Sequence, residues 1–265
     1  MARINQSFCL GLYHRDISLG DLLAKAKEIG FAAVEIWGRH DAPFDELIEL
    51  APGSGLRIAS MIGHQSLADG LNNPANHDRI EDELAESIEL AAKHDIPGLI
   101  CFSGNRRDEP DDEAVDICAD ALRRSAPLAE KHRVNLNVEL LNSRRNHPGY
   151  QCDHTEWGVR LCEAVGSPRV KLLYDIYHMQ IMEGDLIETI RANIAHIGHF
   201  HTAGNPGRGP LGDDQEVYYP AVMRAVAESG YELYVGHEFR SEGDPVEALR
   251  EAFGVCDVSS ALPAG

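Results

Sequence analysis

Four side chains able to bind a divalent metal stand near the ends of four successive short apolar segments. These are Glu139 in VNLNVELLN, Asp175 in VKLLYDIYHM, His201 in HIGHFHTAG and Glu238 in LYVGHEF. Carboxylate oxygens with one imidazole suit Mn²⁺, Mg²⁺, Co²⁺ or Zn²⁺, and no thiolate accompanies them as in many closed structural zinc sites. The pattern predicts one divalent metal ion, of undetermined identity, with coordination positions left for a substrate.

If these segments are strands, alternation places the four side chains on one face of the wall. Residues two apart in a strand point the same way, so Asn137 shares a face with Glu139, and Gly236 shares one with Glu238. The apolar residues between them point to the other face, where helices would cover them. The four candidate ligands are therefore compatible with one interior.

Short apolar runs alternate with amphipathic segments along the whole chain, which predicts eight strands separated by helices. The expected strands are Ser7–Tyr13, Ala32–Trp37, Arg57–Gly63, Gly98–Gly104, Val134–Asn142, Val170–His178, Ile197–Ala203 and Glu232–Phe239. The expected helices are Ser18–Ile29, a short one at Phe44–Leu50, Arg79–His94, Glu113–His132, Glu156–Val165, Leu186–Ile194, Tyr219–Glu228 and Asp244–Phe253. Ser18 and Asp21, and Asp153 and Thr155, are expected to open helices, and Gly30 and Gly230 to close them.

Eight such repeats in 265 residues predict an α/β fold with a single (β/α)8 TIM barrel spanning residues 1–265. Residues 255–265 are expected to form a loose tail. Active sites of this fold are built from the carboxyl ends of the strands, where the four candidate ligands fall.

Composition excludes several classes of function. The formal net charge of −19 argues against nucleic-acid binding, which requires concentrated positive charge. No run approaches the roughly 20 apolar residues of a membrane span. The six cysteines contain no C-x-x-C pair and the start MARINQSFCL lacks an apolar leader, so we expect a cytoplasmic protein whose cysteines mostly pack in the core. Assembly into a homo-oligomer is compatible with the sequence, but no interface is evident.

The most specific stretches are VELLN at 138–142, YDIYHMQIMEGD at 174–185, HFHTAGNPGR at 199–208 and GHEF at 236–239. With the eight repeats, they resemble the xylose isomerase-like barrel superfamily, in particular the hydroxypyruvate isomerase and D-tagatose 3-epimerase group. The resemblance covers essentially the whole chain.

The resemblance implies roles for individual residues. Glu139, Asp175, His201 and Glu238 would bind one catalytic divalent metal, and the two glutamates would form the acid/base pair. His178 and Arg208 would hydrogen-bond oxygens of a small sugar or keto-acid substrate. The group's activity is isomerisation or epimerisation of a ketose, hydroxy-aldehyde or hydroxy-keto acid.

General chemistry is consistent with these residue types. A carbon next to a carbonyl becomes acidic when a metal stabilises the enediolate formed by proton loss. Two carboxylates can then return the proton to the neighbouring carbon, which is isomerisation, or to the opposite face, which is epimerisation. The same first step also serves a lyase that eliminates from a keto-sugar or 3-keto-glycoside, so the motifs leave that alternative open.

Two less favoured alternatives are a non-catalytic sugar-binding barrel and a nuclease acting at abasic DNA. A barrel can lose its chemistry and keep its shape, although both candidate acid/base glutamates are present. The nuclease would require a basic surface and a longer, histidine-rich set of ligands, and the sequence shows neither.

Several further residues have two readings. His199 is expected to be a hydrogen-bonded core histidine, while Glu35, Trp37 and His64 either line the pocket mouth or pack. Six residues after Glu139, the epimerase branch has another glutamate, but this chain has Arg145, preceded by Arg144. If either arginine reaches the pocket, an anionic substrate is favoured; otherwise both belong to an exposed loop.

Overall fold

The computed structural model describes residues 4–15, 17–40, 43–241 and 243–259. Eight parallel strands form the sheet, in the order β1-β8-β7-β6-β5-β4-β3-β2. The strands are β1 (Asn5–Phe8), β2 (Ala33–Glu35), β3 (Arg57–Ile62), β4 (Gly98–Cys101), β5 (Asn135–Glu139), β6 (Val170–Asp175), β7 (Ile197–Thr202) and β8 (Tyr234–His237).

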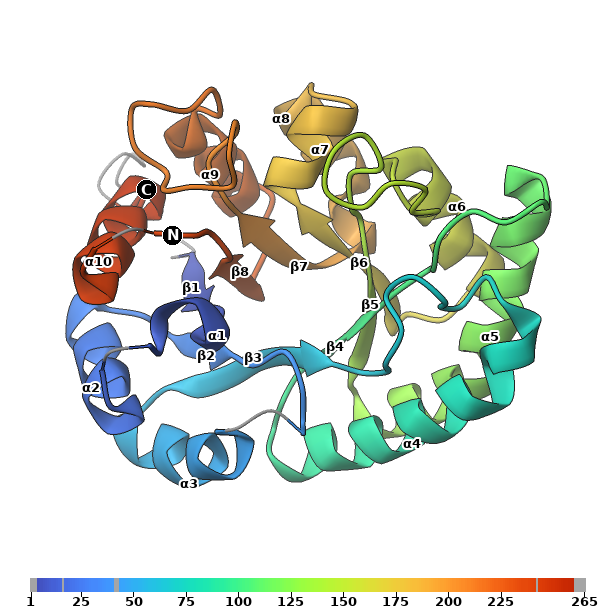
Figure 1. Cartoon of the computed structure of the whole chain (residues 1–265), viewed down its shortest axis with the longest axis horizontal. Coiled ribbons are helices and arrows are strands. Elements are labelled where there is room, and N and C mark those ends of the chain that lie inside the picture. Colours follow the sequence, from blue (N-terminus) through green and yellow to red (C-terminus); the bar gives the residue numbers. More distant parts are fainter. Residues whose placement is uncertain (1–3, 16, 41–42, 242, 260–265) are drawn as a thin grey trace.

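Helices lie between successive strands and surround the sheet in sequence order (Figure 1). They are α1 (Leu10–Tyr13), α2 (Leu19–Ile29), α3 (Phe44–Ser54), α4 (His77–Lys93), α5 (Asp111–His132), α6 (Thr155–Val165), α7 (Ile176–Met182), α8 (Leu186–Asn193), α9 (Tyr219–Glu228) and α10 (Pro245–Cys256). Two 3₁₀ turns, η1 (Pro74–Asn76) and η2 (Ile194–His196), precede α4 and β7.

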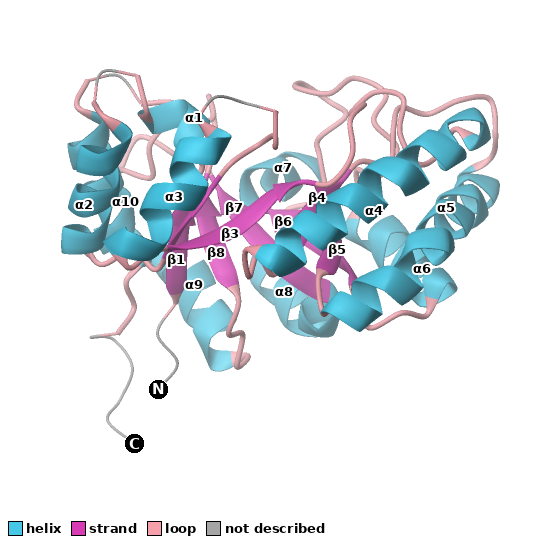
Figure 2. Cartoon of the chain, turned by 90° about the horizontal axis from the view of Figure 1, so that it is seen from below, coloured by secondary structure: helices cyan, strands magenta, loops and turns pink. Residues whose placement is uncertain are grey.

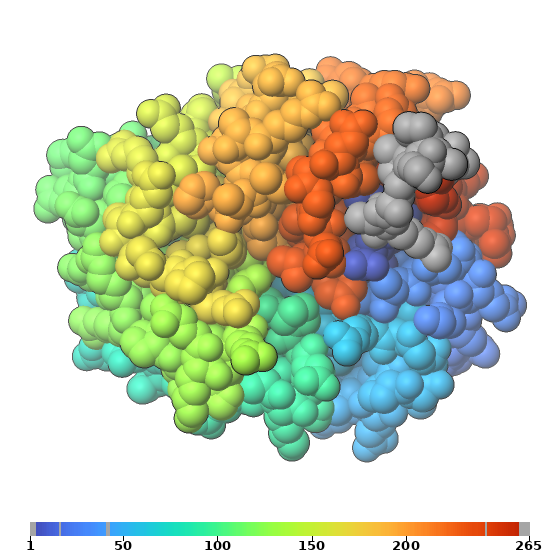
Figure 3. All heavy atoms as spheres, turned by 180° about the vertical axis from the view of Figure 1, so that it is seen from behind, coloured from blue at the N-terminus to red at the C-terminus, as the bar shows by residue number. Residues whose placement is uncertain are grey.

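The sheet closes on itself between its first and second strands. The Ala32 N–H donates to the Gln6 carbonyl at 3.0 Å, and Cys9 forms a bridge with Glu35. This closure makes the protein a (β/α)8 barrel, as the repeat pattern predicted. Figure 2 shows the strands enclosed by helices, and Figure 3 shows successive segments following one another around the outside.

The main apolar core lies between the strands and the helices. Leu136 and Val138 of β5 are fully buried on the outward face of that strand, and Leu22 and Leu23 of α2 are equally buried. The six cysteines are buried and unpaired, as expected for residues that pack. Among the described residues, no helix combines the length and apolar character required to cross a bilayer.

The strands end one to five residues before the ends of the predicted runs, and in two of them a helix occupies the rest of the run. The run Ser7–Tyr13 is a strand only up to Phe8, after which Leu10–Tyr13 forms helix α1. The run Val170–His178 ends as a strand at Asp175, whose carboxylate accepts the His178 N–H and caps α7. Both predictions were wrong because periodicity cannot separate a strand from a short buried helix.

The predicted helices all form, Tyr219–Glu228 with the predicted bounds and the others with at least one shifted end. Ser18 caps α2 as expected, and Gly30 and Gly230 follow α2 and α9 with positive φ. The expected opening of α6 by Asp153 is wrong, because that carboxylate pairs with Arg106 and leaves the helix without a side-chain cap. The expected short helix at Phe44–Leu50 extends to Ser54, and the tail predicted from residue 255 is still helical at Cys256. Residues 260–265 of that tail lie outside the described residues.

Candidate metal centre and substrate pocket

The barrel brings the four predicted ligands to one place. Glu139 and Asp175 are the last residues of β5 and β6, His201 lies in β7, and Glu238 follows β8 directly. One ligand atom from each of the four lies within 4.8 Å of the others, and all four side chains are buried. These positions are at the carboxyl ends of adjacent strands, where barrels of this fold carry their active sites.

The donor set fits a divalent cation. His201 Nδ1 lies 3.5 Å from Glu139 Oε1 and 3.3 Å from Glu238 Oε2, and it is buried without a hydrogen-bond partner among the described residues. A buried ring nitrogen without a partner is costly unless it binds something that this set of side chains lacks. Mn²⁺, Mg²⁺, Co²⁺ or Zn²⁺ would satisfy that nitrogen and the surrounding carboxylates.

Charge is distributed unevenly over the cluster. Burial, reinforced by Glu238, raises the pKa of Glu139, and burial raises the pKa of Asp175 to about 7. Burial alone would raise the pKa of Glu238, but His201 and Arg208 hold it at about 2. Burial alone would lower the pKa of His201, but the nearby acidic groups raise it well above its ordinary value. Such strongly perturbed groups are typical of functional sites.

Arg208 points into the pocket from the loop after β7. Its guanidinium donates to Glu238 Oε2 at 2.5 Å and lies 5.9 Å from the centre of the Tyr177 ring. The backbone at Arg208 is left-handed, with φ of 57°, and its carbonyl accepts the Arg240 N–H. The loop therefore aims inward the side chain that the resemblance assigned to substrate binding.

His178 presents one ring nitrogen toward the metal cluster. Its Nδ1 accepts the Asn142 N–H at 3.1 Å, so the hydrogen of the neutral ring is on Nε2. That Nε2 lies 3.7 Å from Asp175 Oδ2 and is buried without a hydrogen-bond partner in the part of the chain described. Burial lowers the pKa of His178 well below its usual range, so the ring is a neutral donor available to a substrate oxygen.

A cavity of about 210 Å³ opens over the cluster. Its apolar side is formed by Trp37, Ile62, Leu67, Ile100, Phe102 and Leu141, and its polar side by Glu139, His147, His201, Arg208 and Glu238. A larger hollow of about 450 Å³, between α3 and the end of α4, lies near the amino end of β3 and contains none of these polar residues. Three of the four candidate metal ligands, Glu139, His201 and Glu238, therefore line the smaller cavity.

His147 was not predicted as a site residue. It lies in the loop after β5, its ring is 5.3 Å from the His178 ring, and its Nε2 has no hydrogen-bond partner among the described residues.

The same loop shows whether Arg144 or Arg145 reaches the pocket. Arg144 donates to the Ile181 carbonyl, Arg145 is exposed, and neither lines the cavity.

The structure distinguishes the residues that line the cavity from those that pack in the interior. Trp37 lines the cavity, whereas His64 is a packed histidine whose Nε2 accepts the Phe102 N–H and whose Nδ1 contacts the Gln65 carbonyl. His199 is buried with Nε2 at 3.0 Å from Glu35 Oε2, as expected for a hydrogen-bonded core residue. Glu35 itself lies beneath the cluster against His201, not at the pocket mouth.

Known proteins resemble this chain in sequence over most of its length. A family model described as the xylose isomerase-like TIM barrel matches residues 23–257. The chain belongs to that family. It is 31% identical over 232 residues to a putative hydroxypyruvate isomerase of Homo sapiens, covering 83% of each chain. It is 34% identical over 245 residues to a 2-oxo-tetronate isomerase of Cupriavidus necator, covering 87% of this chain and 90% of that one.

Solved structures share the fold of this family member. A protein described as AP endonuclease, family 2, from Brucella melitensis superposes with a TM-score of 0.83 at 24% identity. The match covers 93% of this chain and 97% of the other. Similarity at that level shows the barrel and carries no statement about the reaction.

Proposed function

We propose that the chain is a divalent-metal-dependent isomerase of a small hydroxy-carbonyl compound, a ketose or a hydroxy-keto acid. The observation that carries the proposal is the buried His201 Nδ1, which has no hydrogen-bond partner among the described residues and faces two carboxylates at the floor of a cavity. The two curated relatives, named as isomerases of hydroxypyruvate and 2-oxo-tetronate, support the reaction class. When bound, the ion would act as a Lewis acid on neighbouring substrate oxygens.

Glu139 and Glu238 are the proposed proton-transfer pair. They approach the cavity from β5 and β8, with β6 and β7 between them, so a small substrate over the cluster can contact both. One carboxylate would remove the proton from the hydroxyl-bearing carbon next to the carbonyl, and a carboxylate would return a proton to the former carbonyl carbon. The hydroxyl hydrogen would pass to the former carbonyl oxygen, so that the hydroxyl and carbonyl groups exchange places. Return to the opposite face of the carbon that lost the proton would give epimerisation.

Arg208 and His178 are the proposed substrate-binding residues. The Arg208 guanidinium beside Glu238 and the free His178 Nε2 are donors placed to stabilise negative charge as it develops on substrate oxygens. Because Arg144 and Arg145 do not line the cavity, Arg208 is the single arginine among its lining residues in the described structure. The lining therefore offers limited charge for a strongly anionic substrate.

The nuclease alternative has no support from the charge. A net charge of −19 would repel a DNA backbone, and the cavity is lined mostly by apolar side chains. A non-catalytic barrel would give neither exchange nor products with any substrate, so the assay described below separates it from an enzyme. The lyase alternative shares the first proton-transfer step, so it is decided by the products.

Solvent exchange followed by NMR would test the proposal. Protein loaded with Mn²⁺, Mg²⁺, Co²⁺ or Zn²⁺ would be mixed in D₂O with hydroxypyruvate, 2-oxo-tetronate and simple ketoses. We expect deuterium at the carbon next to the carbonyl, together with an isomer, and loss of both in Glu238→Gln and Glu139→Gln. Glu183→Gln, a carboxylate that bonds Thr155 away from the cavity, should keep the activity.

Two results would contradict the isomerase. Exchange accompanied by loss of water or of a leaving group would assign a lyase. Undiminished turnover in either site variant would remove that glutamate from proton transfer.

A further inference from the structure

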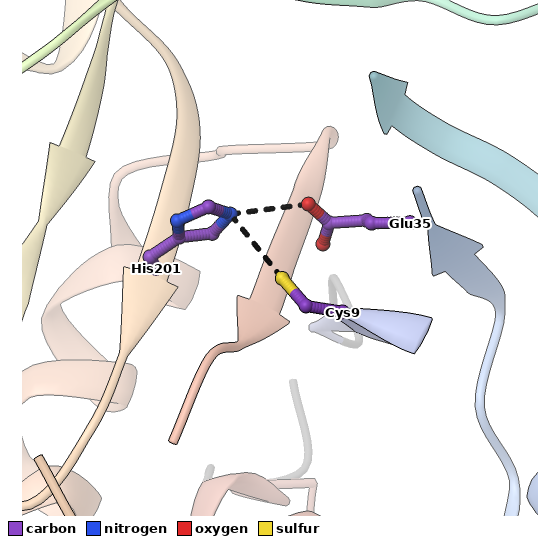
Figure 4. A group of neighbouring side chains, drawn as sticks. All are labelled: Cys9, Glu35 and His201. Atoms are coloured by element: carbon purple, nitrogen blue, oxygen red, sulfur yellow. Dashed lines mark hydrogen bonds and ion pairs between the residues drawn. The ribbon is translucent and has the colours of Figure 1, made fainter. Parts of the chain in front are cut away.

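The two ring nitrogens of His201 face different groups. Nδ1 points to the metal cluster, whereas Nε2 lies 3.1 Å from Glu35 Oε2 on the opposite side of the ring. Figure 4 shows this second side, where Glu35 of β2 and Cys9, just after β1, converge on Nε2. Glu35 belongs to no part of the proposed proton-transfer machinery.

Three donors hold the Glu35 carboxylate in place. The Ser7 hydroxyl donates to Oε1, and the Nε2 atoms of His199 and His201 lie 3.0 and 3.1 Å from Oε2. A carboxylate can only accept, so each imidazole must carry its hydrogen on Nε2. For a neutral ring, this leaves His201 Nδ1 with a lone pair directed at Glu139 and Glu238.

A glycine in β8 leaves space for the Glu35 side chain of β2 to contact His201 in β7. Gly236 of β8 is in register with both Ser7 and His201. A Cβ at Gly236 would lie 2.0 Å from Glu35 Oε1 and 3.0 Å from His201 Cδ2. The missing side chain therefore provides the space through which the carboxylate contacts the imidazole.

We propose that Glu35 is a positioning residue that fixes the tautomer and orientation of His201, so that Nδ1 is the atom offered to the metal. Histidines that bind metals commonly donate their other nitrogen to a carboxylate, and loss of that carboxylate typically weakens metal binding 10- to 100-fold. The inference rests on the metal site of the proposed function and assigns a role to a residue outside it.

Cys9, Glu35 and His201 also have the composition of a cation site, since their ligand atoms lie within 4.8 Å of one another. The hydrogen bonds argue against a second ion. Such an ion would have to remove the hydrogen from His201 Nε2 and compete with His199 for Glu35 Oε2. Cys9 Sγ, 3.9 Å from Nε2, makes only a weak contact.

Metal affinity and the histidine tautomer test this role without any substrate. Mn²⁺ affinity would be measured by competition with a chelator, and ¹⁵N NMR on the protein loaded with diamagnetic Zn²⁺ would show which His201 nitrogen carries the hydrogen and which binds the metal. We expect a 10- to 100-fold loss of affinity in Glu35→Ala, with loss of the single arrangement that has metal on Nδ1 and hydrogen on Nε2, and a smaller loss of affinity in Glu35→Gln, whose amide oxygen still accepts. Urea unfolding would confirm that each variant is folded.

Cys9→Ala is the matched control, because it removes the other group near Nε2 and keeps the carboxylate. It should bind Mn²⁺ as the unchanged protein does, and loss of a second equivalent of metal in it would overturn the proposal in favour of a second ion. Wild-type affinity and an unchanged tautomer in Glu35→Ala would also overturn it. If Glu35→Ala does not fold, Glu35→Gln with the affinity of Cys9→Ala would do the same.

The proposed function fails separately from this inference. An unchanged protein that binds no divalent metal refutes the metal centre itself. Metal binding that is insensitive to Glu35 refutes only the positioning role.

Discussion

His147 and Arg145 lie two residues apart in the loop after β5, yet they face different surroundings. The His147 ring lines the cavity and its Nε2 has no hydrogen-bond partner in the described structure. Arg145 is exposed, and its backbone N–H donates to Asn142. Burial lowers the pKa of His147, so its ring is a neutral group that a substrate hydroxyl or carbonyl can contact.

We therefore expect His147→Ala to raise KM for the true substrate by about 2- to 12-fold, corresponding to the roughly 0.5–1.5 kcal/mol of one neutral hydrogen bond. Steady-state kinetics on the substrate found by solvent exchange would measure it. Arg145→Ala is the control from the same loop and should leave kcat and KM unchanged. A larger effect from Arg145 than from His147 would contradict the orientation of the loop.

The residues that sequence reasoning found and missed differ in how their direction is determined. Glu139 and His201 were predictable because strand alternation sets which face a side chain takes. Arg145 and His147 were not, because an irregular loop has no such period. Glu35 carried a signal that was available: an acidic residue on a buried strand face must find donors, here Ser7 and two histidines.

At the scale of elements, Gly236 in β8 shows how a strand accommodates a contact between two others. Gly236→Ala would place a Cβ against Glu35 Oε1, and we expect destabilisation of about 1–3 kcal/mol from overpacking, with weaker metal binding. Urea unfolding and the Mn²⁺ competition assay would measure the two effects.

Gly254 in the exposed face of α10 provides the comparison. A Cβ there meets nothing within 4 Å, so Gly254→Ala should be neutral or stabilise by up to about 1 kcal/mol. Equal stability of the two alanine variants would show that the strand has more room beside Glu35 than the structure indicates.

The existence of all eight strands was predictable, whereas the two places where a helix replaces the end of a predicted strand were not. Leu10–Tyr13 is apolar and as short as a strand, so composition alone does not reveal that it turns into helix α1. At Asp175 one carboxylate both ends β6 and caps α7, and its second oxygen is what remains for the metal cluster. The sequence pattern identified Asp175 as a candidate metal ligand. It did not show that the same carboxylate also caps helix α7.

At the scale of the whole molecule, the barrel gathers acidic side chains from separate strands in its buried interior. Three carboxylates and one imidazole meet in the buried cluster of a chain with a net charge of −19, and Arg208 is the cation that contacts it among the described residues. Burying like charges together costs free energy, and a divalent ion offsets that cost only in the folded state. The free energy of unfolding should therefore increase when a divalent metal ion binds.

Asp175→Asn separates this electrostatic effect from folding, because asparagine can still cap α7. At a free metal concentration of 100 times Kd, linkage gives the unchanged protein about 2.7 kcal/mol of added stability. For a chain of this size that corresponds to a rise in Tm of roughly 5–10 °C relative to protein in excess chelator. Asp175→Asn should fold but lose most of the rise, as differential scanning calorimetry would show.

Asp244→Asn is the matched control, since Asp244 also caps a helix, α10, and lies outside the metal cluster. Its Tm should rise with metal as much as that of the unchanged protein. If Asp175→Asn keeps the full increment as well, the ion binds elsewhere, because a ligand that contributes to a site cannot be neutralised without weakening what the site holds. If both variants lose it, the increment reflects general screening of surface charge, which monovalent salt at equal ionic strength should then reproduce.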